Sequence, residues 1–276
     1  MGYYAKILRD SIGPNGIRLT TFEVSFPRIV LAEYNTHRSF SRNSASSRAI
    51  PVEKMLMRVE NDPFIPLYWG KNQKGMQADQ ELSAAEQAEA VAVWLEARDM
   101  MATQVRKLVS LGVHKQIANR LLEAFLYHTV IVTSTEYDNF FALRRHKDAQ
   151  PEIRRIADMM FDVFSVSSPT LLKPGEWHLP LVDDFDSLFG EGYTIDDLVR
   201  ICVGRCTRVS YLTHDGKRDP QADIDLASKL QVSGHMSPFE HAAQCLTEHE
   251  AITWSGNLKG WIQYRKTLPG EAVFTG

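Results

Sequence analysis

Apolar and polar residues alternate near the start of the chain. Phe22, Val24 and Phe26 are separated by polar residues, which is the two-residue period of a half-buried strand. A Gly-Pro-Asn-Gly turn at 13–16 precedes this strand, so the residues before the turn and residues 17–26 are predicted to form a hairpin. The apolar run 29–32 follows a proline and predicts a helix.

Two later stretches have helical periodicity. Ser83 and Glu86 have the spacing of a capping box, and the apolar stripe behind them predicts a long helix that ends at Gly112. A second helix is predicted from about 114 to 127. Residues 131–133 are all β-branched, so they either continue this helix or form a strand. The prolines and glycines between 63 and 75 predict a long surface loop.

The pattern changes between 167 and 193, where Pro, Gly and Asp are frequent and long apolar runs are few. This segment is predicted to be a linker or an insertion. It separates an N-terminal part, residues 1–166, from a C-terminal part, residues 194–276. Helices are predicted in the C-terminal part from 194 to about 206 and near 222–232.

The composition is that of an ordinary globular protein, with 276 residues of which 44% are hydrophobic and 24% charged. No apolar run approaches the ~18 residues of a membrane span, so we expect a soluble, cytoplasmic protein. Three scattered cysteines are too few for a disulfide framework. The net charge of -3 gives no basic footprint for a nucleic-acid polymer, so anions must be bound locally.

A cationic, hydroxyl-rich segment of thirteen residues, 36–48, follows the helix predicted at 29–32. It contains three arginines, a histidine, five serines, a threonine and an asparagine, and no acidic residue. Guanidinium forks and hydroxyl groups are typical ligands of phosphate and pyrophosphate. A packed strand and helix that lead into the segment restrict its motion, which favours a binding site over a free polar loop.

The spacing within this segment resembles the signature of flavin-dependent thymidylate synthases. The matching residues are His37, Arg38, Ser41, Asn43, Ser46 and Arg48. Two positions differ, because Thr36 stands where the family has an arginine and Ser44 stands where it has a glutamate. Support for the resemblance must therefore come from other parts of the chain as well.

Two further segments resemble the family. Residues 139–144 read Asn-Phe-Phe-Ala-Leu-Arg, and Ala-Gln-Pro-Glu-Ile-Arg follows at 149–154. By position, Arg144 corresponds to the arginine that holds the uracil ring and Asn139 to a residue that lines the flavin. The segment 112–122 resembles a family helix whose phosphate-binding arginine falls at Asn119 or Arg120, and we favour Arg120 because asparagine carries no charge.

The C-terminal part resembles the family at 207–211 and at 235–241, the latter reading His-Met-Ser-Pro-Phe-Glu-His. In the family this second segment precedes the His-Arg segment, whereas here it follows it. The order indicates a circular permutation or a duplication, and the run 242–271 supports a duplication. Both ends of the chain must then meet in space, with Arg265 or Lys266 supplying the cation missing at Thr36.

The resemblance implies an α+β fold in which a helical bundle packs beside a small, mostly antiparallel sheet. It implies a synthase that converts dUMP to dTMP with FAD, methylenetetrahydrofolate as carbon donor and NADPH as reductant. Arg144 is the implied catalytic residue, because a fixed guanidinium can stabilise negative charge on the uracil ring without a covalent thiolate.

The implied ligand-binding residues fall into two sets. Those for the substrate are Ser44, Ser46, Ser47, Arg48, Arg120 and Gln263. Those for the cofactor are His37, Arg38, Ser41, Asn43, Asn139, His235, Ser237, Glu240 and Arg265. Family members are tetramers with sites shared between subunits, so we expect a homo-oligomer. Its partners would be dUMP and folate, with no nucleic-acid polymer and no membrane.

Two alternatives remain open. One is a related flavoenzyme that installs hydroxymethyl or another group on a pyrimidine nucleotide, since Thr36 and Ser44 depart from the family pattern. The other is a nucleotide-binding homologue that has lost turnover. We expect no metal site: the histidines at 235 and 241 lack HExxH spacing, and the cysteines at 202 and 206 have no further close ligands.

Overall fold

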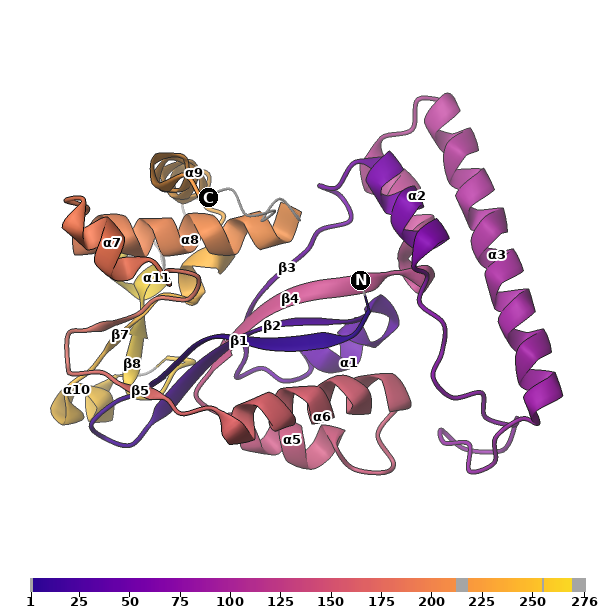
Figure 1. The fold of residues 1–276 in the computed structure, drawn as a ribbon, viewed down its shortest axis with the longest axis horizontal. Coiled ribbons are helices and arrows are strands. Elements are labelled where there is room, and N and C mark those ends of the chain that lie inside the picture. Colours follow the sequence, from indigo (N-terminus) through magenta and orange to yellow (C-terminus); the bar gives the residue numbers. More distant parts are fainter. Residues whose placement is uncertain (1, 212–217, 255, 270–276) are drawn as a thin grey trace.

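A five-stranded sheet lies at the centre of the structure, a computed structural model that describes residues 2–211, 218–254 and 256–269. The strand order is β3-β4-β2-β1-β5, and neighbouring strands are antiparallel except for the parallel pair β1 and β5. The strands are β1 (Tyr4–Ile12), β2 (Arg18–Pro27), β3 (Ser41–Ser44), β4 (Tyr127–Ser134) and β5 (Thr170–Leu171). The expected α+β class with a mostly antiparallel sheet is confirmed (Figure 1).

Strands β1 and β2 form the predicted hairpin. The prediction that β2 is half buried is wrong, because the polar residues Glu23 and Ser25 are buried as well as the apolar ones. Helices α5 (Asp138–Arg144) and α6 (Pro151–Val166) pack on one face of the sheet, and α8 (Ile195–Tyr211) covers β3 and β4 on the other (Figure 1). The alternation of apolar and polar residues identifies a strand, but it does not show that an element later in the sequence will cover the polar face of that strand.

The helix predicted from about 114 to 127 is wrong over most of its length. The chain forms one short turn, α4 (Lys115–Ala118), then a 3-10 helix, η2 (Asn119–Phe125), and enters β4 at Tyr127. The strand alternative for residues 131–133 is confirmed, since β4 pairs with β2 on one side and β3 on the other. β-branched residues suit a strand that has neighbours on both edges.

The long helix is confirmed as α3 (Ala84–Ser110). The Ser83 hydroxyl accepts the backbone N–H of Glu86, and the Glu86 carboxylate accepts the backbone N–H of Ser83. Gly112, at φ +80°, reverses the chain after the helix, in the left-handed region that favours glycine. Helix α3 packs beside α2 (Val52–Asn61), and one isolated bridge, between Gly70 and Glu81, interrupts the predicted surface loop that joins them.

Residues 167–193 and the C-terminal part together form a second, antiparallel sheet of β6 (Trp177–His178), β7 (Ala243–Cys245) and β8 (Trp261–Gln263). Residues 167–193 also contain α7 (Phe185–Gly190), and the C-terminal part contains α9 (Pro220–Val232), η3 (Ser237–Glu240), α10 (Glu248–Thr253) and α11 (Tyr264–Thr267). Both α8 and η3 pack against β3 of the central sheet. The C-terminal part therefore shares a core with the N-terminal sheet. No helix in the described ranges is long and apolar enough to cross a membrane.

A buried chain of hydrogen bonds crosses the central sheet. Ser11 Oγ lies 2.9 Å from Nδ1 of His178, whose Nε2 lies 2.8 Å from Thr21 Oγ1. Thr21 is bonded to Thr133 at 2.7 Å, and Thr133 Oγ1 lies 2.8 Å from Nδ1 of His241. All five side chains have zero exposure. The chain links β1, β2 and β4 to β6 and to the residue that follows η3, so it joins the two parts of the protein.

We predict that the free energy of unfolding falls as the pH is lowered from 7 to 5, and that His241→Gln reduces this fall. Burial lowers the pKa of His241 to about 3. The unfolded chain protonates this histidine near pH ~6.5, so its contribution to stability is complete above that pH and is lost progressively below it. The expected loss at pH 5 is about 2 kcal/mol for His241.

Urea denaturation between pH 7 and pH 5 measures this effect. The matched control is His249→Gln, because His249 is exposed on α10. Its substitution should leave the pH dependence of stability unchanged. An identical pH dependence in His241→Gln and in the unsubstituted protein would contradict the prediction.

Candidate functional site

The segment that carries Thr36 and His37 is anchored by a buried aromatic residue. Strand β2 leads through η1 (Arg28–Val30) into α1 (Leu31–Asn35), where the fully buried Tyr34 packs against Phe26 with a ring separation of 4.7 Å. In the turn that follows, the backbone N–H of Thr36 donates a hydrogen bond to the carbonyl oxygen of Glu33 at 3.1 Å. Aromatic packing therefore fixes the position at which the polar segment begins.

The imidazole of His37 lies in an aromatic corner. Its ring stacks on Phe40 at 5.7 Å and meets Phe140 edge-on at 4.9 Å. Only 7% of the residue is exposed. Burial, with the nearby cations Arg144 and Arg42, lowers the pKa of His37 to about 4. The imidazole is therefore neutral at neutral pH and can accept a hydrogen bond.

Arg144, the last residue of α5, donates a hydrogen bond to the imidazole of His37. Its Nε donates to Nε2 of His37 at 2.9 Å, and its Nη2 donates to Oγ1 of Thr36 at 3.0 Å. The Thr36 hydroxyl in turn donates to Glu33 O at 2.6 Å. Among the described residues, every acceptor of Arg144 is thus uncharged, so the guanidinium is held in place without an ion pair to neutralise its charge.

A cavity of about 580 Å³ opens beside this arrangement. Its lining combines cations, an amide and two acids with apolar groups: Thr36, His37, Arg38, Ser39, Thr135, Glu136, Asp138, Asn139, Phe140, Leu143 and Arg144. Arg38 and Asn139 are exposed at its wall. Glu136 is paired with Lys259. Four of the predicted site residues, at positions 37, 38, 139 and 144, therefore meet at one cavity.

A second group of predicted residues joins β3 to the C-terminal part. The amide of Gln263 donates to Ser41 Oγ at 2.6 Å, and Asn43 Nδ2 donates to Cys206 O at 2.8 Å. Arg265 pairs with Glu240 at 2.5 Å. Ser41, Asn43 and Gln263 are buried. In this chain these three side chains hold the two parts together, and their contact with a ligand stays a prediction.

The expectation that the two ends of the chain meet is supported by this group, because η3 packs against β3. The other half of that expectation differs from the structure. The guanidinium beside Thr36 belongs to Arg144, whereas Arg265 is paired with Glu240, and a role for Lys266 at Thr36 stays a prediction. His235 and Ser237 are exposed, and the imidazole of His235 is bonded to Ser233.

A third group lies beyond the opposite end of β3, away from His37. Ser47 donates to the Glu123 carboxylate at 2.7 Å, and Arg120 donates to the same oxygen at 2.8 Å. The same carboxylate also pairs with Arg28 at 3.1 Å. Asn119, the other candidate, is fully buried and donates to backbone carbonyls, so it is structural. Arg48 is exposed, and Ser44 and Ser46 are half-buried.

Sequence reasoning missed several residues of the cavity. Glu136 and Asp138 flank the predicted segment 139–144, and their charge could have drawn attention to them. Thr36 was noted only as a departure from the family pattern, yet its hydroxyl is an acceptor for Arg144. Nothing in the sequence indicates that pairing, because the two residues are brought together by tertiary packing. Within the described residues, no cluster of three or more potential metal ligands exists.

Comparison with known protein families identifies the class of this chain. The family model Thy1, described as thymidylate synthase complementing protein, matches residues 18–170, more than half of the sequence. The chain belongs to this family. The match includes the polar segment 36–48 and the segment 139–154, so the resemblance found in those motifs is confirmed.

Comparison with solved structures finds partial similarity to the UMP/dUMP methylase PolB from Streptomyces cacaoi. The structure bound with 5-Br dUMP has a TM-score of 0.45 and 20% identity, over 54% of this chain and 67% of that chain. The structure bound with 5-Br UMP has a TM-score of 0.49 and 16% identity, over 59% of this chain and 88% of that chain. A comparison with curated protein sequences gave no match.

We predict that Arg144→Met raises the pKa of His37 while leaving it below 6.5. Arg144 is the second cause of the lowered pKa after burial, so removal of its charge relieves only part of the effect. A titration of the imidazole Cε1–H signals by NMR measures the change. Arg38→Met is the matched control, because Arg38 lines the same cavity but does not perturb His37. An unchanged His37 pKa in Arg144→Met would contradict the geometry.

Proposed function

We propose that this chain is a flavin-dependent thymidylate synthase. It converts dUMP to dTMP, with FAD as its flavin, methylenetetrahydrofolate as carbon donor and NADPH as reductant. Family membership supports the class of reaction. The observation that carries the proposal is the Arg144 guanidinium, which is fixed by two neutral acceptors at the wall of a polar cavity.

The residues around this cavity fit a flavin dinucleotide. Arg38 and Arg144 offer guanidinium groups for a pyrophosphate or a ring carbonyl, and Asn139 offers an amide that can both donate and accept. Phe140 and Leu143 provide apolar surface for a planar ring. When bound, the flavin supplies hydride transfer, and His37, Arg38 and Asn139 are the residues that would hold it.

Arg144 has a defined task in the proposed reaction. Carbon C5 of uracil becomes nucleophilic when negative charge accumulates on the ring, and a positioned guanidinium stabilises that charge. The neutral His37 and Thr36 orient Arg144 without cancelling its charge. A covalent thiolate route has no support in this chain, because all three cysteines are buried and burial raises the pKa of Cys245.

The substrate phosphate is assigned to the other end of β3. Ser46 and Arg48 lie beyond Ser44, the last residue of the strand, whereas His37 lies before Ser41, the first. Ser46 and Arg48 do not line the cavity beside Arg144. A complete site therefore combines Arg144 of one copy with the 44–48 loop of another, which makes the protein a homo-oligomer.

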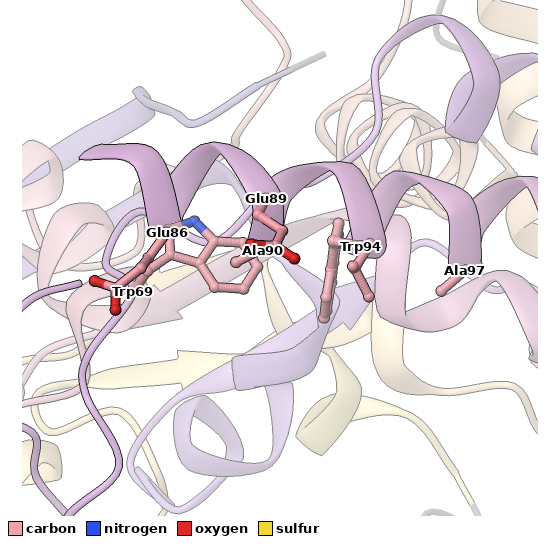
Figure 2. A pocket seen from close by; sticks show the side chains of 7 residues that line it. Trp69, Glu86, Glu89, Ala90, Trp94 and Ala97 are labelled. Carbon is pink, nitrogen blue, oxygen red and sulfur yellow. The ribbon is translucent and has the colours of Figure 1, made fainter. Parts of the chain in front are cut away.

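Helix α3 offers a surface for such an assembly. It has 27 residues, of which two, Ala102 and Val105, are buried. Val93 and Met100 are 60% and 53% exposed, and Leu111 beyond the helix end is 78% exposed. Figure 2 shows Trp69 beside Glu86 and Ala90 of α3, and Trp94 of the same helix, at a hollow of about 440 Å³ that is largely apolar. Exposed apolar surface of this kind is typical of protein interfaces.

Purified protein is expected to bind FAD and to turn yellow. Under anaerobic conditions NADPH should bleach the flavin absorbance, and addition of dUMP and methylenetetrahydrofolate should then yield dTMP. Mass spectrometry of the nucleotide product separates methyl from hydroxymethyl transfer. A protein that stays colourless after incubation with FAD would contradict the proposal. Bound flavin that NADPH cannot reduce would indicate a homologue without turnover.

Two variants, one single and one double, test the proposed division of roles. Arg144→Lys is expected to keep dUMP binding within about tenfold and to lose most of the turnover, because a point charge replaces a planar fork. Ser46→Ala with Arg48→Ala is expected chiefly to weaken dUMP binding. Steady-state kinetics and equilibrium binding of dUMP separate the two effects.

Coexpression of the two variants with different affinity tags tests whether sites are shared. Hetero-oligomers should recover turnover, because some sites then combine an intact Arg144 with an intact 44–48 loop. The matched control is coexpression of each variant with itself under both tags, which should recover none. Hetero-oligomers that stay inactive would place the complete site within one chain.

A further inference from the structure

A second cavity, about 470 Å³ in volume, lies between β6, the start of α7 and the start of α8. Most of its wall is apolar and comes from Leu172, Trp177, Leu179, Val182, Phe185 and Ile195. It shares no lining residue with the cavity beside Arg144. We infer that this cavity is a separate binding site for a small apolar carboxylate, distinct from the proposed substrate and cofactor sites.

Arg9 supplies the cation for the carboxylate. It lines the cavity, and its Nε is buried without a hydrogen-bond partner in the part of the chain that the structure describes. A buried donor that lacks an acceptor destabilises the protein, and the cost is greater when the group is charged. A ligand carboxylate would satisfy this guanidinium. The neighbouring His178 does not compete for the anion, because burial and the charge of Arg9 lower its pKa well below the usual range.

A β-bulge directs Arg9 toward the cavity. The register of β1 against β2 shifts between Ile7 and Arg9. In a regular strand consecutive side chains point to opposite faces, but here Leu8 packs in the α8 cluster and Arg9 lines the cavity on the same side. Asp10 then returns to the other face, where it pairs with Arg18. Bulges that re-aim one side chain are frequent beside binding sites.

One wall of the cavity is held in a strained conformation. Leu181 lies between the lining residues Leu179 and Val182 and has φ 65°, in the left-handed region that a bulky side chain rarely adopts. The carbonyl of Leu181 accepts from Nη1 of Arg205 at 2.8 Å, and Arg205 is itself fixed by a bidentate pair with Asp184. Backbone strain stabilised in this way is typical of ligand-binding walls.

The sign of the ligand charge follows from the two charged residues of the lining. Glu176 is exposed at the rim, and its carboxylate accepts the backbone N–H of Lys173 at 2.8 Å. Its hydrogen-bonding need is therefore met by the protein and by solvent. Arg9 has a buried donor that is not satisfied. The site thus favours an anion at Arg9, with an apolar body of the ligand against Leu179, Val182 and Phe185.

Isothermal titration calorimetry with 2-naphthoate and its neutral analogue 2-naphthalenemethanol tests the site. The unsubstituted protein should bind naphthoate at least about tenfold more tightly than the alcohol, as expected for a charge-assisted hydrogen bond. Arg9→Met should remove this preference and leave the affinity for the alcohol unchanged. Ile195→Trp, at the partly exposed rim, should block both probes by filling the cavity.

The control variant is Arg144→Met, which should bind naphthoate as the unsubstituted protein does. Thermal denaturation verifies that each variant is folded. The inference is overturned if naphthoate does not bind at millimolar concentration, if Arg9→Met binds it equally well, or if Arg144→Met alone abolishes binding. These outcomes leave the proposed synthase activity untouched, because no residue of this second cavity takes part in it.

Discussion

The structure depends on the buried hydrogen-bond chain that crosses the central sheet from Ser11 to His241. Each hydroxyl in it can donate one hydrogen bond and accept another, and each neutral imidazole can do the same, so every contact between neighbouring members can form in either direction. The chain ends at Nε2 of His241, which is buried and has no hydrogen-bond partner among the described residues. Of its two histidines, His178 belongs to β6 and His241 to the C-terminal part, and its two threonines belong to β2 and β4. Desolvation makes this arrangement costly to break, because every member would leave a buried polar group without a partner.

That constraint positions the segment around η3 against β3, although about two hundred residues separate them in the sequence. The cost of closing such a loop grows only with the logarithm of its length, so a rearranged motif order is physically tolerable. Two hydrogen bonds then stabilise the contact: Gln263 donates to Ser41 Oγ of β3, and Asn43 of β3 donates to the carbonyl oxygen of Cys206. The same β3 residues that resemble a family signature therefore also act as structural links in this chain.

Much of the fold could be predicted from local patterns. The hairpin and the capped helix from Ala84 each carry their own signal of alternation or capping. The helix predicted at 114–127 was wrong over most of its length, because a short apolar run does not distinguish a regular helix from a short turn, a 3-10 helix and the start of a buried strand. The pairing of Thr36 with Arg144 also had no local signal, since the two residues lie 108 positions apart. Tertiary packing decides such features, and one sequence does not display it.

The way Arg144 is held distinguishes it from two other arginines of the candidate site, Arg120 and Arg265. Arg120 and Arg265 are bonded to carboxylates, at Glu123 and Glu240, so much of their field is cancelled locally. Arg144 is bonded to an imidazole, a hydroxyl and a backbone carbonyl, none of which carries a charge at neutral pH. A carboxylate in the place of His37 would orient the guanidinium equally well but would neutralise it. Neutral acceptors therefore provide orientation and leave the positive charge for a ligand, which is the condition that stabilisation of an anionic ring requires.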